Sequence, residues 1–274
     1  MELRYLYPHW GSEGLHIQDW LSIVQTNGFH GVEINLPETP ETIEAFQEAI
    51  DGIRAQDPDF VLVLQQVFGV ERESPQAYID KVLDRLTHLA TFEPNFINSH
   101  TGKDHYSFDD NCRIIEAIEN FAVQSGIPVY HEIHRGRFTF HSTTLLPYLA
   151  LFPELKLVGD LSHWCVVAES MLQDQADIIE QVVPHIRHLH ARVGFEQSPQ
   201  VNHPFAPEWS ERLLIFLDWW QQIIHHHQDQ NWFSITPEFG PFPYMPALPF
   251  SKSPIADQQA INVEMKTWLQ AHLT

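Results

Sequence analysis

Short apolar segments alternate with longer amphipathic segments along the whole chain, and this pattern restricts the fold more than any other feature of the sequence. The apolar segments are short enough to be strands. The segments between them carry apolar residues at three- and four-residue spacing, which is typical of helices packed on a core. The chain contains eight such pairs. Eight strand–helix units predict a parallel sheet closed into a (β/α)8 TIM barrel.

The expected elements can be placed by residue number. Strands are expected at residues 3–7, 31–36, 60–66, 96–100, 128–134, 156–161, 186–193 and 232–239. Helices are expected at residues 17–26, 40–54, 75–89, 109–124, 143–151, 170–183, 208–226 and 256–272. The 274 residues are close to the ~250 residues of one barrel, and no linker rich in Gly, Pro or Ser divides them. We therefore expect a single domain over residues 1–274.

The apolar runs and the first residues of the chain indicate its cellular location. Hydrophobic residues make up 43% of the chain, enough for a large core, but the apolar runs are far shorter than the ~20 residues that cross a bilayer. The first residues lack the features of a secretory signal. We expect a cytoplasmic protein without a membrane partner. Cys112 and Cys165 are too few for a disulfide framework, and we interpret both as core thiols.

The charge of the chain argues against nucleic acid as a partner. Thirty-six acidic residues against 15 basic ones give a formal charge of −21, and such a field repels phosphate backbones. The expected partner is a small molecule, and a homo-oligomer is compatible with the sequence. The 18 histidines are an unusual number for this length. Because histidine is the commonest metal ligand at neutral pH, their positions matter.

Polar and charged residues gather where the expected strands end, and active sites of barrels lie at these carboxyl ends. In chain order they are Asn98 and His100, Glu132 and His134, Asp160 and His163, then His188, His190 and Arg192, and finally Glu238. Because strand side chains alternate between two faces, Glu132 and His134 share one face, as do His188, His190 and Arg192, and Asn98 lies on the same face as His100. We expect all three sets to point into the barrel.

Four of these residues predict a metal site. Glu132, Asp160, His190 and Glu238 follow four successive strands, without neighbouring lysines to balance their charge. Buried carboxylates cost several kcal/mol unless they are paired or bind a cation. Three carboxylates and one imidazole suit Mn²⁺, Mg²⁺ or Co²⁺, and Zn²⁺ is also compatible with them. Taken singly, Asp160 could equally be a helix cap, Glu238 a salt-bridge partner and His190 a hydrogen-bonded core residue.

The chain resembles the xylose isomerase-like sugar isomerases and epimerases, a TIM-barrel family related to endonuclease IV. The resemblance covers the whole chain. Its specific part is Glu132 after strand five, Asp160-x-x-His163 after strand six, His190 within His-x-His-x-Arg on strand seven, and Glu238 on strand eight. It implies that the quartet binds one catalytic divalent metal and that the two glutamates flank the carbon that loses and regains a proton. It also implies that His163 and Arg192 hold substrate oxygens.

Reasoning from the residues agrees with this implication. A divalent ion stabilises the enediolate formed when a hydroxy-carbonyl compound loses a proton. One carboxylate can remove the proton and the other can return it, either to the opposite face for epimerisation or to the neighbouring carbon for isomerisation. We therefore expect a metal-dependent isomerase or epimerase of a sugar or related polyhydroxy carbonyl compound. The substrate and the stereocentre are left open.

Several residues have two interpretations at this point. His100, His134 and His188 are candidate substrate contacts, but inward polar residues also satisfy one another. Glu33 and Asn35 share a face that could reach the pocket floor, and a structural hydrogen bond would explain them as well. We expect His131 to point outward and the run His225-His226-His227 to lie on the surface. Aromatic rings are expected to form either a wall of the pocket or a cap on the barrel core; they belong to Tyr7, His9, Trp10, Phe68 and Trp164. The proline-rich loop 240–254 is expected either to cover the catalytic face or to serve as a spacer.

Other functions compete with that of an isomerase. A dehydratase would use the same metal and expel a hydroxyl group, and a non-catalytic metal- or sugar-binding barrel would keep the site without turnover. An endonuclease IV-type nuclease is disfavoured by the charge and by Gln65 and Gln66, which stand where a further histidine is needed. Lys103 lies in too hydrated a loop for a Schiff-base aldolase. Gly is scarce after strands seven and eight, which argues against a phosphate site, while Arg135, Arg137 and Arg192 leave anion binding open.

Overall fold

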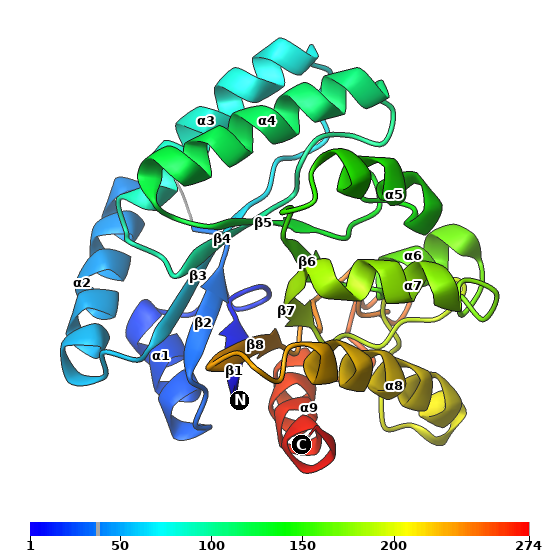
Figure 1. Cartoon of the computed structure of the whole chain (residues 1–274). Helices are drawn as coiled ribbons and strands as arrows, with labels where there is room; N and C mark the ends of the chain where they lie inside the picture. Colours follow the sequence, from blue (N-terminus) through cyan, green and yellow to red (C-terminus); the bar gives the residue numbers. More distant parts are fainter. Residues whose placement is uncertain (37–38, 274) are drawn as a thin grey trace.

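The computed structural model describes residues 1–36 and 39–273 and shows a closed barrel of eight parallel strands. The strands follow one another around the barrel in the order of the sequence, and the helices surround them (Figure 1). The strands are β1 (Glu2–Pro8), β2 (Gly31–Ile34), β3 (Val61–Gln66), β4 (Phe96–Ser99), β5 (Val129–Glu132), β6 (Leu157–Gly159), β7 (Ile186–His190) and β8 (Trp232–Thr236). The predicted (β/α)8 fold is confirmed.

The α-helices lie on the outside of the barrel (Figure 1). They are α1 (Ile17–Thr26), α2 (Pro40–Gln56), α3 (Pro75–Ala90), α4 (Phe108–Ser125), α5 (Ser142–Leu151), α6 (Ser162–Ala168), α7 (Ala176–Val182), α8 (Ser210–His226) and α9 (Gln258–His272), with short 3-10 turns η1 (Val183–His185) and η2 (Pro207–Trp209). Ser74 and Asp257 cap α3 and α9 by accepting hydrogen bonds from first-turn amides, which have no partner inside a helix. Within the described residues, no helix has the length and hydropathy that a membrane crossing requires.

The structure differs from the expected elements at two kinds of position. The strands β2 and β4 to β8 end one to three residues earlier than predicted, because the residues that follow them leave the ladder and continue as loops or, after β6, lead into a helix. The predicted helix 170–183 is wrong as a single element. Its first residues lie between α6 and α7, and α6 itself was not predicted. The reason is local: Glu169 ends α6 in the left-handed region at φ 47°, which the sequence pattern does not reveal.

The inside of the barrel is layered. Its lower part is apolar and contains Leu6, Val61, Val63 and Phe96, all 0–1% exposed. Phe96 stacks on Tyr130 of β5 with ring centroids 4.3 Å apart. Above this layer the inward side chains become polar, starting with Glu33 of β2. The apolar layer therefore closes the amino end of the barrel and leaves the polar groups to the carboxyl end, where barrel enzymes place their chemistry.

A second, larger core lies between the strands and the helices. Tyr7 belongs to it and packs edge-on against Phe29, so its expected place in the wall of the pocket is wrong. His131 lies on this outer face as predicted, between Thr101 and Glu119 of α4. Cys112 and Cys165 are buried free thiols, as expected. His227 was expected on the surface but is only 3% exposed and stacks on Phe233.

Candidate metal centre

The four residues of the predicted quartet come together at the carboxyl end of the barrel. Each of Glu132, Asp160, His190 and Glu238 offers a ligand atom, and these atoms all lie within 4.8 Å of one another. Glu132 and His190 end β5 and β7, Asp160 directly follows β6, and Glu238 lies two residues beyond β8. Asp160 and His190 are almost completely buried, whereas Glu132 and Glu238 line a cavity. Four successive strands therefore deliver one compact set of donors.

The chain after β8 is held in place by two amide side chains. Asn262 of α9 accepts a hydrogen bond from the Phe239 amide at 2.8 Å and donates to the Phe239 carbonyl at 3.0 Å. Gln200 bonds the amide and the carbonyl of Gly240 in the same way, at 2.8 and 3.1 Å. These four bonds satisfy the backbone beyond the sheet and fix the position of Glu238, which no strand partner holds.

Glu132 is surrounded by donors from β4 and the segment after it. Asn98 donates to its Oε2 at 2.7 Å, and the His100 Nε2 lies 2.9 Å from the same oxygen. Burial alone would raise the pKa of Glu132, but the neighbouring His100 and His190 outweigh it and lower the pKa. One oxygen of Glu132 is therefore fixed by hydrogen bonds. The other, Oε1, lies 3.8 Å from the His190 Nδ1.

Asp160 is buried and accepts hydrogen bonds from the neutral Ser162 and from the positively charged Arg192. Ser162 donates to its Oδ1 through the backbone amide at 3.1 Å and through its hydroxyl, and Arg192 bonds its Oδ2. Burial raises the pKa of Asp160 to about 6, although Arg192 and His190 lower it. Arg192 also lies 3.4 Å from the Glu238 Oε2. The guanidinium thus balances part of the negative charge of the quartet.

His190 is oriented by Glu33. Its Nε2 lies 3.0 and 3.1 Å from the two carboxylate oxygens of Glu33. Its Nδ1 lies 3.0 Å from the Glu238 Oε2, yet it is buried and makes no hydrogen bond there. A hydrogen bond from Nε2 leaves the lone pair of Nδ1 directed at the quartet, which is the arrangement of a metal-binding histidine held by a carboxylate.

Glu33 joins four strands beneath the quartet. It accepts hydrogen bonds from Gln65 at 3.1 Å, from Asn98 at 3.0 Å and from Thr236 at 2.6 Å, and the His188 Nε2 lies 3.1 Å away. Burial would raise the pKa of Glu33, but His190 and His188 hold it well below its usual value. The sequence placed Glu33 on a face that could reach the pocket floor. It could not show that its partners come from β3, β4, β7 and β8.

The donor set fits a divalent cation. Three carboxylates and one imidazole nitrogen form an oxygen-rich site of the kind that hard divalent ions bind. Burial would lower the pKa of His190, but the carboxylates of Glu238, Glu33 and Glu132 raise it well above its usual value. The guanidinium of Arg192 offsets part of the negative charge of these carboxylates, and a bound divalent ion would offset more of it.

A cavity of about 720 Å³ opens above the quartet. Its lining includes Trp10, His100, His134, Arg137, Arg192 and Tyr244. Trp10 packs edge-on against Tyr244 with centroids 4.8 Å apart. A side chain at position 240 would collide with the Trp10 ring, so glycine is required there. Tyr244 comes from the proline-rich loop 240–254, and one of the two expectations for that loop, a position over this face, is confirmed.

The other predicted site residues lie at different depths. His100 and His134 line the cavity, with ring centroids 4.4 Å apart. His163 lies behind them, completely buried, with its Nε2 3.0 Å from Arg192. His188 lies deeper, against Ser234 and Glu33. Of the expected aromatic wall, Trp164 is buried and donates to the Thr139 carbonyl at 2.9 Å, so it is part of the core.

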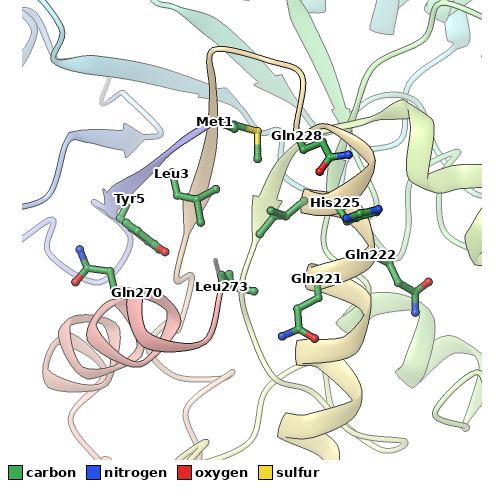
Figure 2. A pocket seen from close by; sticks show the side chains of 10 residues that line it. Met1, Leu3, Tyr5, Gln221, Gln222, His225, Gln228, Gln270 and Leu273 are labelled. Atoms are coloured by element: carbon green, nitrogen blue, oxygen red, sulfur yellow. The ribbon is translucent and has the colours of Figure 1, made fainter.

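A second cavity, of about 780 Å³, lies between the start of the chain and helices α8 and α9. Figure 2 shows its walls: Gln221, Gln222, His225 and Gln228 from α8 and the turn after it, Gln270 and Leu273 from α9 and its end, and Met1, Leu3 and Tyr5 at the start of the chain. The described residues that line it include no Asp or Glu. It therefore lacks the carboxylate donors of the quartet.

Comparisons with known proteins agree with the fold. No family model matches the chain, and no curated protein matches it. Among solved structures, the probable 3-DHS dehydratase AsbF from Bacillus anthracis, involved in petrobactin synthesis, has a TM-score of 0.64 at 16% identity, covering 99% of both chains. The 3-keto-D-glucoside 4-epimerase YcjR from E. coli has a TM-score of 0.58 at 13% identity, covering 98% of this chain and 100% of its own.

A third solved structure is a xylose isomerase-like TIM barrel protein from Mycobacterium smegmatis in complex with magnesium. Its TM-score is 0.62 at 12% identity, and the match covers 99% of this chain and 96% of that one. The chain thus has the fold of the xylose isomerase-like TIM barrels, as predicted. At these sequence identities the likeness concerns the fold alone.

Proposed function

We propose that this protein is a metal-dependent sugar isomerase or epimerase that transfers a proton next to a carbonyl group. The observation that carries the proposal is the position of Glu132 and Glu238. They come from β5 and β8, line the same cavity, and each brings one oxygen into the group of four donors. Two carboxylates above a common cation site can act as the base and the acid of one proton transfer.

The two glutamates are held in the same way. In Glu132 the Oε2 is bound by Asn98 and His100, and in Glu238 the Oε1 accepts a hydrogen bond from Gln65 at 3.3 Å. The remaining oxygen of each faces the His190 Nδ1, at 3.8 and 3.0 Å. Fixed carboxylates keep their geometry while a proton is removed and returned, and this preorganisation favours proton transfer.

A divalent ion bound by Glu132, Asp160, His190 and Glu238 would stabilise the negative charge that develops as the proton leaves. Mg²⁺, Mn²⁺ or Co²⁺ suits these donors, and Zn²⁺ is compatible with them. The magnesium complex of one structural neighbour supports this choice. Asp160 and His190, which lie below the cavity, would serve as ligands only, whereas the glutamates would have both roles.

The side chains that line the cavity suit a small polyhydroxy substrate. Its lining offers the imidazoles of His100 and His134 and the guanidinium of Arg192 for hydroxyl or carbonyl oxygens, and the Trp10 ring for an apolar face. His163 and His188 would act on the substrate through Arg192 and through Glu33 and His190, because neither is exposed. The epimerase among the structural neighbours is consistent with such a substrate.

Exchange of carbon-bound hydrogen with solvent tests the proposal. Metal-loaded protein incubated in heavy water with a panel of ketoses is expected to introduce deuterium next to the carbonyl of at least one of them, as seen by NMR. Removing the metal with a chelator should stop the exchange, and adding Mg²⁺ or Mn²⁺ should restore it. Metal-loaded protein that exchanges no member of the panel would contradict the proposal. Loss of water, seen as a new ultraviolet absorbance, would favour a dehydratase, which one structural neighbour is described as being.

A further inference from the structure

We infer that the substrate carries a carboxylate and that Arg137 binds it. The inference rests on the proposed function, because it concerns the far end of the molecule whose hydroxy-carbonyl part would lie at the quartet. Acidic residues greatly outnumber basic ones in this chain, 36 against 15. An arginine that lines a cavity and has no acidic partner is therefore unexpected.

Arg137 is such an arginine. It is half-buried in the turn that follows β5 and lines the cavity. One of its terminal nitrogens donates to the Phe68 carbonyl at 3.0 Å, and its buried Nε has no hydrogen-bond partner. Among residues 1–36 and 39–273, no carboxylate lies within ion-pair distance of it. A partly desolvated guanidinium without a counter-charge is costly unless an anion pairs with it.

Arg192 also lines the cavity, but its partners differ from those of Arg137. Arg192 is 1% exposed and is already paired with Asp160 and Glu238. Arg135 adds positive charge nearby, since its guanidinium lies over the Tyr244 ring, 5.3 Å from the centroid, and has no carboxylate partner in the described part of the chain. Arg137 is therefore a cavity-lining cation without a carboxylate partner among the described residues, and Arg135 adds a second positive charge near Tyr244.

Arg137 and two glutamates of the quartet line one cavity. Arg137 and Glu132 line the same cavity of about 720 Å³, and His134 lies between them in the chain. His134 belongs to a compact group with His100 and Glu132, and its backbone carbonyl accepts the Arg137 amide at 3.2 Å. A hydroxy-carbonyl compound with a terminal carboxylate could thus reach the quartet and Arg137 together.

A carboxylate explains these contacts better than a phosphate. Barrel enzymes often bind phosphate through backbone amides after strands seven and eight. Here the amides of Phe239 and Gly240 are taken by Asn262 and Gln200, and the Ala191 amide is bonded to Thr236. A single guanidinium with a planar pair of donors matches a carboxylate without further amides. The substrate class that follows is a keto sugar acid.

Matched ligand pairs test the inference. Binding of D-fructuronate and D-fructose, and of D-tagaturonate and D-tagatose, is measured by calorimetry on the Mg²⁺-loaded protein, with fructose 6-phosphate as a phosphate probe. Because charge-assisted hydrogen bonds are strong, we expect at least one acid to bind about tenfold to hundredfold more tightly than its neutral partner. Arg137→Gln is expected to abolish this preference, and Arg137→Lys to keep part of it.

The controls separate this inference from the proposed function. Arg113→Gln on the exposed face of α4 makes the same charge change and should leave the preference intact. Mg²⁺ affinity should be unchanged in Arg137→Gln, which also reports on folding. Equal binding of acids and neutral sugars, no binding of either acid, tighter binding of the phosphate, or a preference that survives in Arg137→Gln would each overturn the inference. Failure to bind Mg²⁺ would instead refute the proposed function.

Discussion

Replacing Glu132 or Glu238 by glutamine is expected to lower the rate of solvent-deuterium exchange by at least about 10²–10⁴-fold, the usual contribution of a general acid or base. Glutamine keeps the size of the side chain and can still accept the hydrogen bonds of Asn98 and His100 at position 132, or of Gln65 at position 238. It cannot take up a proton at neutral pH. The loss should therefore appear in the chemical step, measured as deuterium incorporation under saturating metal.

A matched control lies on the outside of the barrel. Glu119 of α4 lies 3.0 Å from His131, which precedes Glu132 in β5 but points to the opposite side of the strand. Glu119→Gln changes the same functional group without touching the cavity, and it should retain exchange close to the unsubstituted rate. Near-normal exchange in Glu132→Gln or Glu238→Gln, with the metal bound, would show that these carboxylates do not transfer the proton.

Removing the negative charge of Glu33 is expected to weaken metal binding by about tenfold to hundredfold, the usual effect of losing the carboxylate behind a metal-bound histidine. In Glu33→Gln the amide no longer attracts the Nε2 proton of His190, so Nδ1 loses basicity and its fixed direction. The stability of the fold should also fall, by up to about 3–5 kcal/mol, because buried cationic or polar partners lose their counter-charge. Titration with Mn²⁺ and thermal unfolding in its absence measure the two effects separately.

The Glu33 experiment has two comparisons. Glu33→Asp keeps the charge and should retain more Mn²⁺ affinity than Glu33→Gln. Glu119→Gln changes a carboxylate that contacts a histidine outside the barrel, and it should leave the Mn²⁺ affinity unchanged. An unchanged Mn²⁺ affinity in a folded Glu33→Gln protein would mean that Glu33 does not orient a metal ligand.

Much of the barrel could be predicted because it depends on a local pattern. Strand and helix periodicities repeat eight times, and strand parity alone places Glu132, His100 and His190 on the inner face, where the structure has them. The ends of elements were less predictable. The end of α6 depends on the backbone of Glu169, whose left-handed conformation has no signature in its residue type.

The parts of the site that could not be predicted depend on contacts between distant segments. The sequence of the four-residue strand β2 does not reveal which side chains hydrogen-bond to its glutamate. The role of Glu33 in orienting His190 could therefore not be predicted. Tyr244 lies in an irregular loop, and periodicity does not say which side chain of such a loop turns inward. Aromatic residues near strand ends were assigned to a pocket wall or a barrel cap by position alone. The wall is wrong for Tyr7, which packs on the outer core, and for Trp164, which lies in α6 and is buried.

Anomalous diffraction from Mn²⁺-soaked crystals tests the central claim most directly, because it locates the ion without assuming an activity. We expect one strong peak at the carboxyl end of the barrel, liganded by Glu132, Asp160, Glu238 and the Nδ1 of His190, with the Nε2 of His190 still on Glu33. A peak at another group of residues, or none at the quartet while Arg192 remains paired with Asp160 and Glu238, would contradict the account.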